Sequence, residues 1–163
     1  MDHDSQQHGH AMPSMKYSTF GWMIAAGTVI MYGLMYLNVY RADHIFFSQT
    51  RAWMALIMGA TMAVVMLAFM WNMYPDKRTN AAILVGSAVV FAVSLWLVRS
   101  QATVDDVSYM KAMIPHHSIA ILTSERARIR DRRVRKLADG IIDAQKREIG
   151  EMKDLIRDLD GKR

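Results

Sequence analysis

Three long stretches without a charged side chain constrain this chain more than any other feature of its sequence. They run over residues 20–40, 52–74 and 81–98, and none contains Asp, Glu, Lys or Arg. A helix needs roughly 20 apolar residues to cross the hydrocarbon core of a bilayer. The sequence therefore predicts three transmembrane helices.

Aromatic side chains near the ends of these stretches support the same prediction. Their amphipathic rings favour the level of the lipid headgroups. The first stretch is long, lacks an A-x-A-type exit and is followed by two more, so we expect it to remain in the mature protein rather than to be removed as a signal peptide. The aromatic residues are Trp22, Tyr36, Tyr40, Trp53, Trp71, Tyr74 and Trp96.

The chain has no cysteine and 15 methionines. Disulfides, zinc–thiolate sites and thiol catalysis are therefore excluded. His, Met and the carboxylates remain as ligands for any metal ion, and this set is softer than that of a typical zinc site.

The composition divides the chain into three parts. Residues 1–17 are polar, rich in His and Met and interrupted by Pro13, which predicts a flexible tail. Residues 18–100 hold the apolar stretches, and residues 101–163 carry most of the positive charge. We expect the last part to be a soluble helical domain.

Two amphipathic helices are expected in residues 101–163. The first covers 103–130, with Thr103 and Asp106 as a capping box and a kink at Pro115. The second covers 131–159, with apolar residues at helical spacing. Together they form an α-helical hairpin that turns near residues 130–133. The expected fold is all-α.

A two-helix hairpin buries little surface by itself. It should either dimerise into a ferritin-like four-helix bundle or pack on the membrane part, and we favour the homodimer. With three crossings, the N-terminus and the turn 75–80 lie on one side of the bilayer. The connection 41–51 shares the other side with the hairpin. Positive charges near the membrane are balanced between the two sides, so charge does not determine the orientation: Lys16, Lys77 and Arg78 against Arg41, Arg51 and Arg99.

The hairpin carries two stripes of metal-ligating residue types. Both stripes have the spacing i, i+3, i+7, which places each on one helical face. Thioether sulfur and neutral imidazole suit Cu(I), and a carboxylate or amide can orient an imidazole or complete a site for a harder divalent ion. The alternative is that the methionines pack in the core and the histidines are a polar pair beside a kink. The residues are Met110, Met113 and His117 with His116 adjoining, and Gln145, Glu148 and Met152.

The same residues resemble a known family, the domain of unknown function numbered 305. Its pattern is D-x-x-F, M-I-x-H-H and then Q-x-x-E-I-x-x-M, and the resemblance covers about residues 103–159. The matching positions are Asp106, Tyr109, Met113, Ile114, Pro115, His116, His117, Ala120 and Ile121, then Gln145, Glu148, Ile149 and Met152.

The resemblance implies a ferritin-type helical bundle, often exported, with periplasmic copper-binding members. Carried over by position, it implies Met113, His116, His117 and Met152 as ligands and Asp106, Gln145 and Glu148 as supporting groups. One position departs from the pattern H-H-x-x-A-x-x-M, because Thr123 stands where the family often has Met. A hydroxyl there lowers the expected affinity for a soft metal.

Other patterns have simpler interpretations. Methionines recur every four residues from Met54 to Met70, which favours adaptable packing in lipid over a copper path. Gly59 and Ala63, with Gly27 and Gly33, indicate close helix contacts. His44 is interpreted as a lone histidine at the membrane interface. The tail residues either capture a metal at the membrane surface or belong to a merely flexible tail, which gives the same composition: His3, His8, His10, Met12 and Met15. The basic run is interpreted as a solvated turn: Arg126, Arg128, Arg130, Arg132, Arg133, Arg135 and Lys136.

We therefore predict a non-enzymatic, multi-pass protein of a bacterial inner membrane that binds copper on a periplasmic hairpin. The expected partners are the lipid bilayer, a metal ion and a second copy of the chain, with no nucleic acid. One alternative is a metal-free module for oligomerisation in the membrane. Another is a cytoplasmic hairpin that binds anionic lipid or nucleic acid through its basic run.

Overall fold

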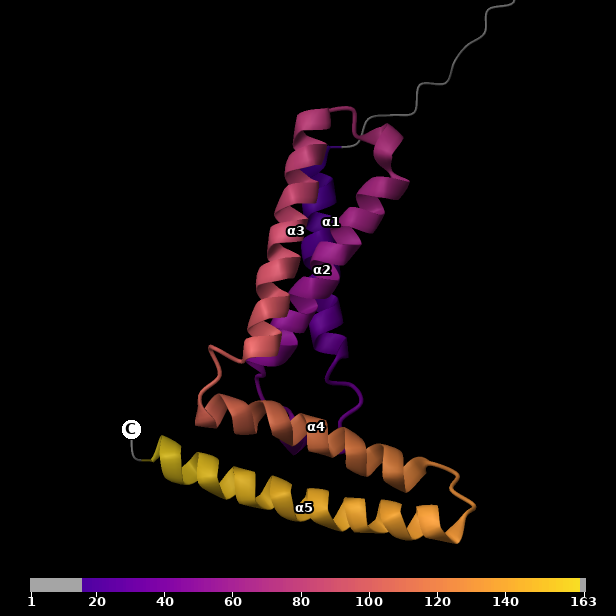
Figure 1. Cartoon of the computed structure of the whole chain (residues 1–163), viewed down its shortest axis with the longest axis vertical. Coiled ribbons are helices and arrows are strands. Elements are labelled where there is room, and N and C mark those ends of the chain that lie inside the picture. Colours follow the sequence, from indigo (N-terminus) through magenta and orange to yellow (C-terminus); the bar gives the residue numbers. More distant parts are fainter. Residues whose placement is uncertain (1–15, 162–163) are drawn as a thin grey trace, which may run out of the picture.

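A computed structural model describes residues 16–161 of the chain, and this part is all-helical, with no strand (Figure 1). The predicted tail lies outside the described residues except for Lys16 and Tyr17. The helices are α1 (Tyr17–Leu34), α2 (Gln49–Phe69), α3 (Lys77–Ser100), α4 (Asp106–Arg126) and α5 (Arg132–Asp160), with short 3-10 turns η1 (Ala42–His44) and η2 (Trp71–Met73).

Helix α2 is the centre of a three-helix bundle, with α1 and α3 packed on it. Small residues let the helices approach closely, since the buried face of α2 is mainly Ala and Gly. A Cβ added at Gly59 would collide with Thr28 of α1, and one at Gly27 would lie 2.8 Å from Met62 Cε. The close contacts predicted from the glycines are thus confirmed for Gly27 and Gly59.

Among the described residues, the structure has two helices that could cross a membrane, so the prediction of three spans is wrong. Only α2 and α3 are both long enough and apolar enough to cross a membrane. Helix α1 has 18 residues and ends at Leu34, short of the predicted end at residue 40. Its three glycines and its polar start lower its hydropathy. The chain beyond Leu34 leaves the helix and turns toward the hairpin.

Helices α4 and α5 form the predicted antiparallel hairpin, with corrected boundaries. The first helix starts at Asp106, three residues later than predicted, because Asp105 is the N-cap and accepts a hydrogen bond from Ser108 N at 2.8 Å. Asp131 caps α5 in the same way, accepting from Arg133 N at 2.8 Å. Helix α4 ends at Arg126, and Pro115 lies inside it.

The hairpin has its own apolar core. Ile114 and Ile121 of α4 are 0% and 1% exposed, and they belong to one cluster with buried isoleucines of α5. Tyr40 and Phe46 from the connection between α1 and α2 pack against this cluster. The hairpin therefore packs on residues 35–48, which we call the linker.

The hairpin lies across the end of the bundle where α1 stops and α2 begins (Figure 1). Helix α4 faces the bundle, contacting α2 and η1, and α5 lies on its far side. As expected, the linker and the hairpin share one end of the molecule. Dimerisation of the hairpin stays a prediction.

Candidate functional site

The two predicted stripes meet at His117 of α4 and Glu148 of α5. His117 Nδ1 lies 3.1 Å from Glu148 Oε2, and Gln145 Nε2 donates to the same carboxylate oxygen at 3.4 Å. The His117 side chain is 16% exposed, whereas that of Glu148 is 40% exposed. The structure thus brings three of the seven predicted ligands together across the hairpin.

The electrostatics of His117 favour a neutral ring. Burial lowers its pKa from 6.5, the Glu148 carboxylate opposes this shift and His116 adds to it. Despite the short separation from Glu148, Nδ1 is buried and makes no hydrogen bond among the described residues. The Glu148 carboxylate therefore contacts this nitrogen as a charge neighbour without a well-directed hydrogen bond.

The remaining predicted ligands separate into core and surface residues. Met110 is 7% exposed and belongs to the hairpin core, and Met152 packs against that core. Met113 is half-buried one turn before His117. His116 is exposed, with its ring centroid 6.3 Å from that of His117. Within residues 16–161, no group of three His, Asp or Glu is arranged to hold a metal ion.

Two further positions of the pattern have structural contacts of their own. Thr123, which stands at the place of a family Met, donates from Oγ1 to Ile119 O at 3.0 Å. Its hydroxyl is thus directed to its own helix. Asp106 lies in the first turn of α4, beside the N-cap Asp105.

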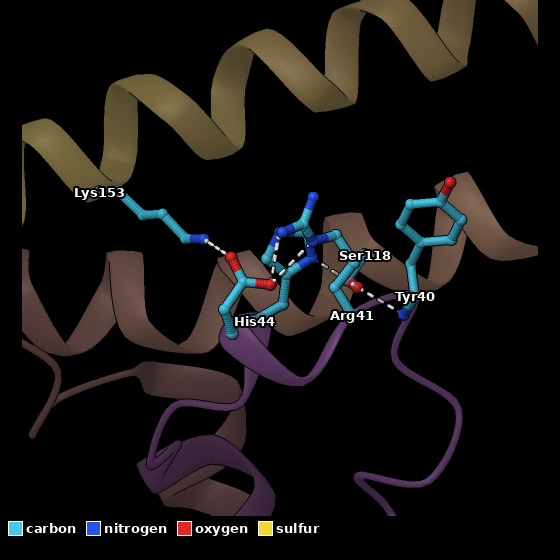
Figure 2. Close-up of polar contacts among 6 residues, drawn as sticks. Tyr40, Arg41, His44, Ser118 and Lys153 are labelled. Carbon is cyan, nitrogen blue, oxygen red and sulfur yellow. Dashed lines mark hydrogen bonds and ion pairs between the residues drawn. The ribbon is translucent and has the colours of Figure 1, made fainter.

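A second polar cluster joins the linker to the hairpin, and it includes a histidine that we interpreted as isolated (Figure 2). His44 is 6% exposed, and its Nδ1 lies 2.9 Å from Ser118 Oγ. Tyr40 N donates to the same hydroxyl at 2.7 Å. Ser118 itself is fully buried in α4. His44 is therefore not the lone residue that we predicted, because its ring is buried and bonded to the hairpin.

Ion pairs continue this cluster from the linker to α5. Lys153 Nζ lies 2.8 Å from Asp43 Oδ2, and Arg41 Nε lies 3.0 Å from Asp43 Oδ1 (Figure 2). The hydrogen bond from Lys153 is the main cause that lowers the pKa of Asp43 from 3.8 to about 2. Burial lowers the pKa of His44, and the nearby Lys153 adds to this effect.

Sequence reasoning missed this cluster because its members are far apart in the chain. His44 and Ser118 are separated by 74 residues, and Asp43 and Lys153 by 110 residues. One signal was available. Ser118 is a hydroxyl on the apolar face of α4, between Ile114 and Ile121, and a buried hydroxyl requires hydrogen-bond partners.

The comparisons with known proteins identify the family of the hairpin region. The family described as Domain of unknown function (DUF305) matches residues 106–163. The chain is also 33% identical over 106 residues to an uncharacterized protein of Acanthamoeba polyphaga mimivirus, covering 64% of this chain and 68% of that protein. The chain belongs to the DUF305 family. No solved structure matches it.

The two matches cover different parts of this DUF305 protein. The family region begins at the first residue of α4 and includes the His117–Glu148 pair. The alignment with the viral protein is longer than the stretch 106–163, so it extends upstream of the hairpin. The likeness to that relative therefore includes residues outside the DUF305 region.

Proposed function

We propose that this DUF305 protein is a non-enzymatic, membrane-anchored metal-binding protein whose hairpin binds copper as Cu(I). His117 is the central ligand, with Met113 and His116 of the same helix as further donors. Glu148, with Gln145, is the supporting carboxylate. The single observation that carries the proposal is the buried His117 Nδ1, which has no hydrogen-bond partner among the described residues.

Membrane insertion is supported by the surface of the bundle. The most apolar stretch of α3 is only 11% buried, and that of α2 is 28% buried, so neither helix is enclosed by the rest of the chain as a soluble core helix would be. The outward side chains include Phe69, which is 88% exposed, and Trp22 of α1, which is 75% exposed. An apolar surface of this extent requires lipid or protein around it.

The choice of a soft metal rests on the donor types. The hairpin offers imidazole and thioether groups and no thiolate. This set suits Cu(I), while Glu148 would admit a harder divalent ion. When bound, copper would be held by these ligands without taking part in a reaction. The side chains would orient the ion and limit its contact with water.

Since one hairpin does not offer a complete ligand set, we propose that a second copy completes it. Helix α5 has an outward apolar stripe in which Val134, Leu137 and Ile141 are 49%, 65% and 36% exposed. Its spacing continues through Gln145 and Glu148, so a partner packed on the stripe would reach the His117 site. Homodimerisation is thus part of the proposal.

The test is Cu(I) competition against a chromophoric chelator with the full chain in detergent. The tail histidines His3, His8 and His10 are replaced by Asn in every sample, because the tail would otherwise bind copper. We expect one stoichiometric site, lost in His117→Ala. Glu148→Gln should weaken affinity about 10–100-fold, as loss of a supporting carboxylate does elsewhere.

Met54→Leu, at an exposed methionine of α2, is the matched control and should leave the affinity unchanged. Stoichiometric binding that survives both His116→Ala and His117→Ala would reject this site. A site lost equally in Met54→Leu would place the copper in the bundle instead.

A metal-free oligomerisation module is the second candidate, favoured by the packing of Met110 and Met152 in the core and by the exposed stripe of α5. It predicts no change of thermal stability on adding Cu(I) or Zn(II). A metal that binds only the folded state must raise that stability. Metal analysis of untagged protein and a thermal titration separate the two candidates.

We propose that the membrane is a bacterial inner membrane with the hairpin on its periplasmic side. A reporter enzyme fused after Arg163 tests this orientation. Activity only in the cytoplasm would reject the periplasmic hairpin and favour the basic run as a binder of anionic lipid or nucleic acid. Within that run, Arg133 pairs with Asp131 at 3.0 Å and Arg135 with Asp139 at 2.8 Å.

A further inference from the structure

A pocket of about 380 Å³ lies between the linker and the hairpin, and neither His117 nor Glu148 lines it. The linker contributes Arg41, Asp43 and His44 to its lining, and α5 contributes Lys146, Gly150 and Lys153. A Cβ added at Gly150 would meet nothing within 4 Å, which shows that this wall is open space. The copper proposal uses none of these residues.

The charges around the pocket are mainly positive. Arg41, Lys146 and Lys153 line it, and Asp43 is its one lining carboxylate. Asp43 holds Arg41 and Lys153 in place at 3.0 and 2.8 Å. The carboxylate paired with Lys146 is Glu125, at 3.3 Å, and it does not line the pocket. Three cations thus face two carboxylates, one in the lining and one just outside it, which leaves one positive charge in excess.

His44 adds a directed hydrogen-bond donor to this wall. Ser118 Oγ accepts from Tyr40 N and also lies 2.9 Å from His44 Nδ1. In the tautomer in which the Ser118 hydroxyl donates to Nδ1, the neutral ring carries its proton on Nε2. That nitrogen lies 4.0 Å from Asp43 Oδ1, too far for a hydrogen bond. In that tautomer a neutral N–H donor stands beside Arg41, Lys146 and Lys153 in one pocket.

The pocket also has a particular place in the molecule. It is formed at the end of the bundle where α2 begins at Gln49, only a few residues from η1. If α2 spans a bilayer, this level is that of the headgroups, which extend about 5–7 Å beyond the hydrocarbon on each side. An anion at this level would meet ammonium, guanidinium and imidazole donors together.

We propose that this pocket binds a phosphate group, either in the headgroup of an anionic lipid or as free phosphate. A tetrahedral phosphate has enough oxygens to accept from several of these donors at once. The pocket is larger than one phosphate and leaves room for the glycerol of a headgroup. Only the lipid source rests on the proposed membrane insertion, and neither source rests on copper.

The experiment titrates the full chain in detergent, at constant ionic strength and with a chelator that removes copper. The probes are inorganic phosphate and monomeric dihexanoyl phosphatidylglycerol, with dihexanoyl phosphatidylcholine as the zwitterionic comparison, and the readout is the thermal unfolding midpoint. We expect saturable stabilisation by at least one anionic probe. Lys146→Gln should raise its Kd about tenfold, and Lys146→Arg should restore most of the affinity.

Lys136→Gln, at an exposed lysine of α5 outside the pocket, is the matched control. Stabilisation by phosphatidylglycerol alone would identify the lipid headgroup as the ligand. Stabilisation by inorganic phosphate alone would identify free phosphate, and stabilisation by both would show that the pocket recognises the phosphate group itself. No saturable effect of either anionic probe, or equal losses in Lys146→Gln and Lys136→Gln, would overturn the proposal. Because copper is absent throughout, failure here is distinguishable from failure of the copper site.

Discussion

The bundle and the hairpin are both made of long helices, yet they are held together in different ways. Contacts within the bundle use small residues, as where Gly59 lies against Thr28, and the outer faces are apolar and exposed. The hairpin instead buries a row of isoleucines and exposes charge, with ion pairs such as Lys146–Glu125 joining its helices.

This difference indicates different surroundings for the two regions. In lipid, apolar burial does not drive helices together, so close packing of small residues must do so. In water, the burial of isoleucine is the main stabilising term. The linker between the regions makes two kinds of contact with the hairpin. Phe46 packs on its apolar core, and His44 forms a hydrogen bond with the buried hydroxyl of Ser118. The following predictions test this contrast.

The largest effect is expected from a cavity in the hairpin core. Ile114→Ala removes a side chain that is 0% exposed and should destabilise the hairpin by about 3–4 kcal/mol. Hydrogen–deuterium exchange of the α4 and α5 amides measures the loss. Leu155→Ala, at a position 51% exposed, is the control and should cost less than about 1 kcal/mol. Equal losses would mean that apolar burial does not hold the hairpin.

A smaller effect is expected where α1 crosses α2. Gly59→Leu forces the two helices apart against Thr28 and should cost about 2 kcal/mol by overpacking. The measurement is the thermal unfolding midpoint in detergent, with a cysteine cross-link between α1 and α2 as a local probe. Gly86→Leu, where a Cβ meets nothing within 4 Å, is the matched variant. An unchanged cross-link in Gly59→Leu would show that close packing is not essential there.

The junction between the regions should respond more weakly. Ser118→Ala leaves Tyr40 N and His44 Nδ1 without their shared partner, which should cost about 1–2 kcal/mol. The measurement is amide hydrogen exchange, which should become faster only in the linker and the middle of α4. Ser124→Ala on the same helix is the comparison. If both variants exchange alike, the buried hydroxyl does not join linker to hairpin.

The smallest effect is a pH dependence of this junction. Because burial lowers the pKa of His44 in the folded state, the unfolded chain takes up a proton first as the pH falls. Its stabilising contribution is full above the unfolded value of 6.5 and is lost as the pH drops toward the lower folded value. His44→Gln should reduce the slope of the unfolding midpoint against pH between pH 7.5 and 5.5, and His117, whose pKa is also lowered by burial, contributes the remainder. His116→Gln, at an exposed position, is the control. An unchanged slope in His44→Gln would assign the dependence elsewhere.

The predicted metal site shows how far helical spacing alone can identify residues that meet across the hairpin. Helical spacing placed His117 opposite Glu148 and Gln145, and the structure has these three together. The same spacing grouped Met110 and Met152 with them, although both pack in or on the core. Spacing defines a face of a helix, but it does not show how far that face is rotated toward its neighbour.

The sequence by itself determined the order of the helices and the presence of a hairpin, because apolar periodicity and capping residues such as Asp131 act within a few residues of chain. It placed the end of the first hairpin helix at residue 130, whereas α4 ends at Arg126. It also identified the DUF305 region. Only the tertiary structure decided that α1 ends at Leu34 and that His44 binds Ser118. Those outcomes depend on groups far apart in the chain, whose contacts form only when the linker packs on the hairpin.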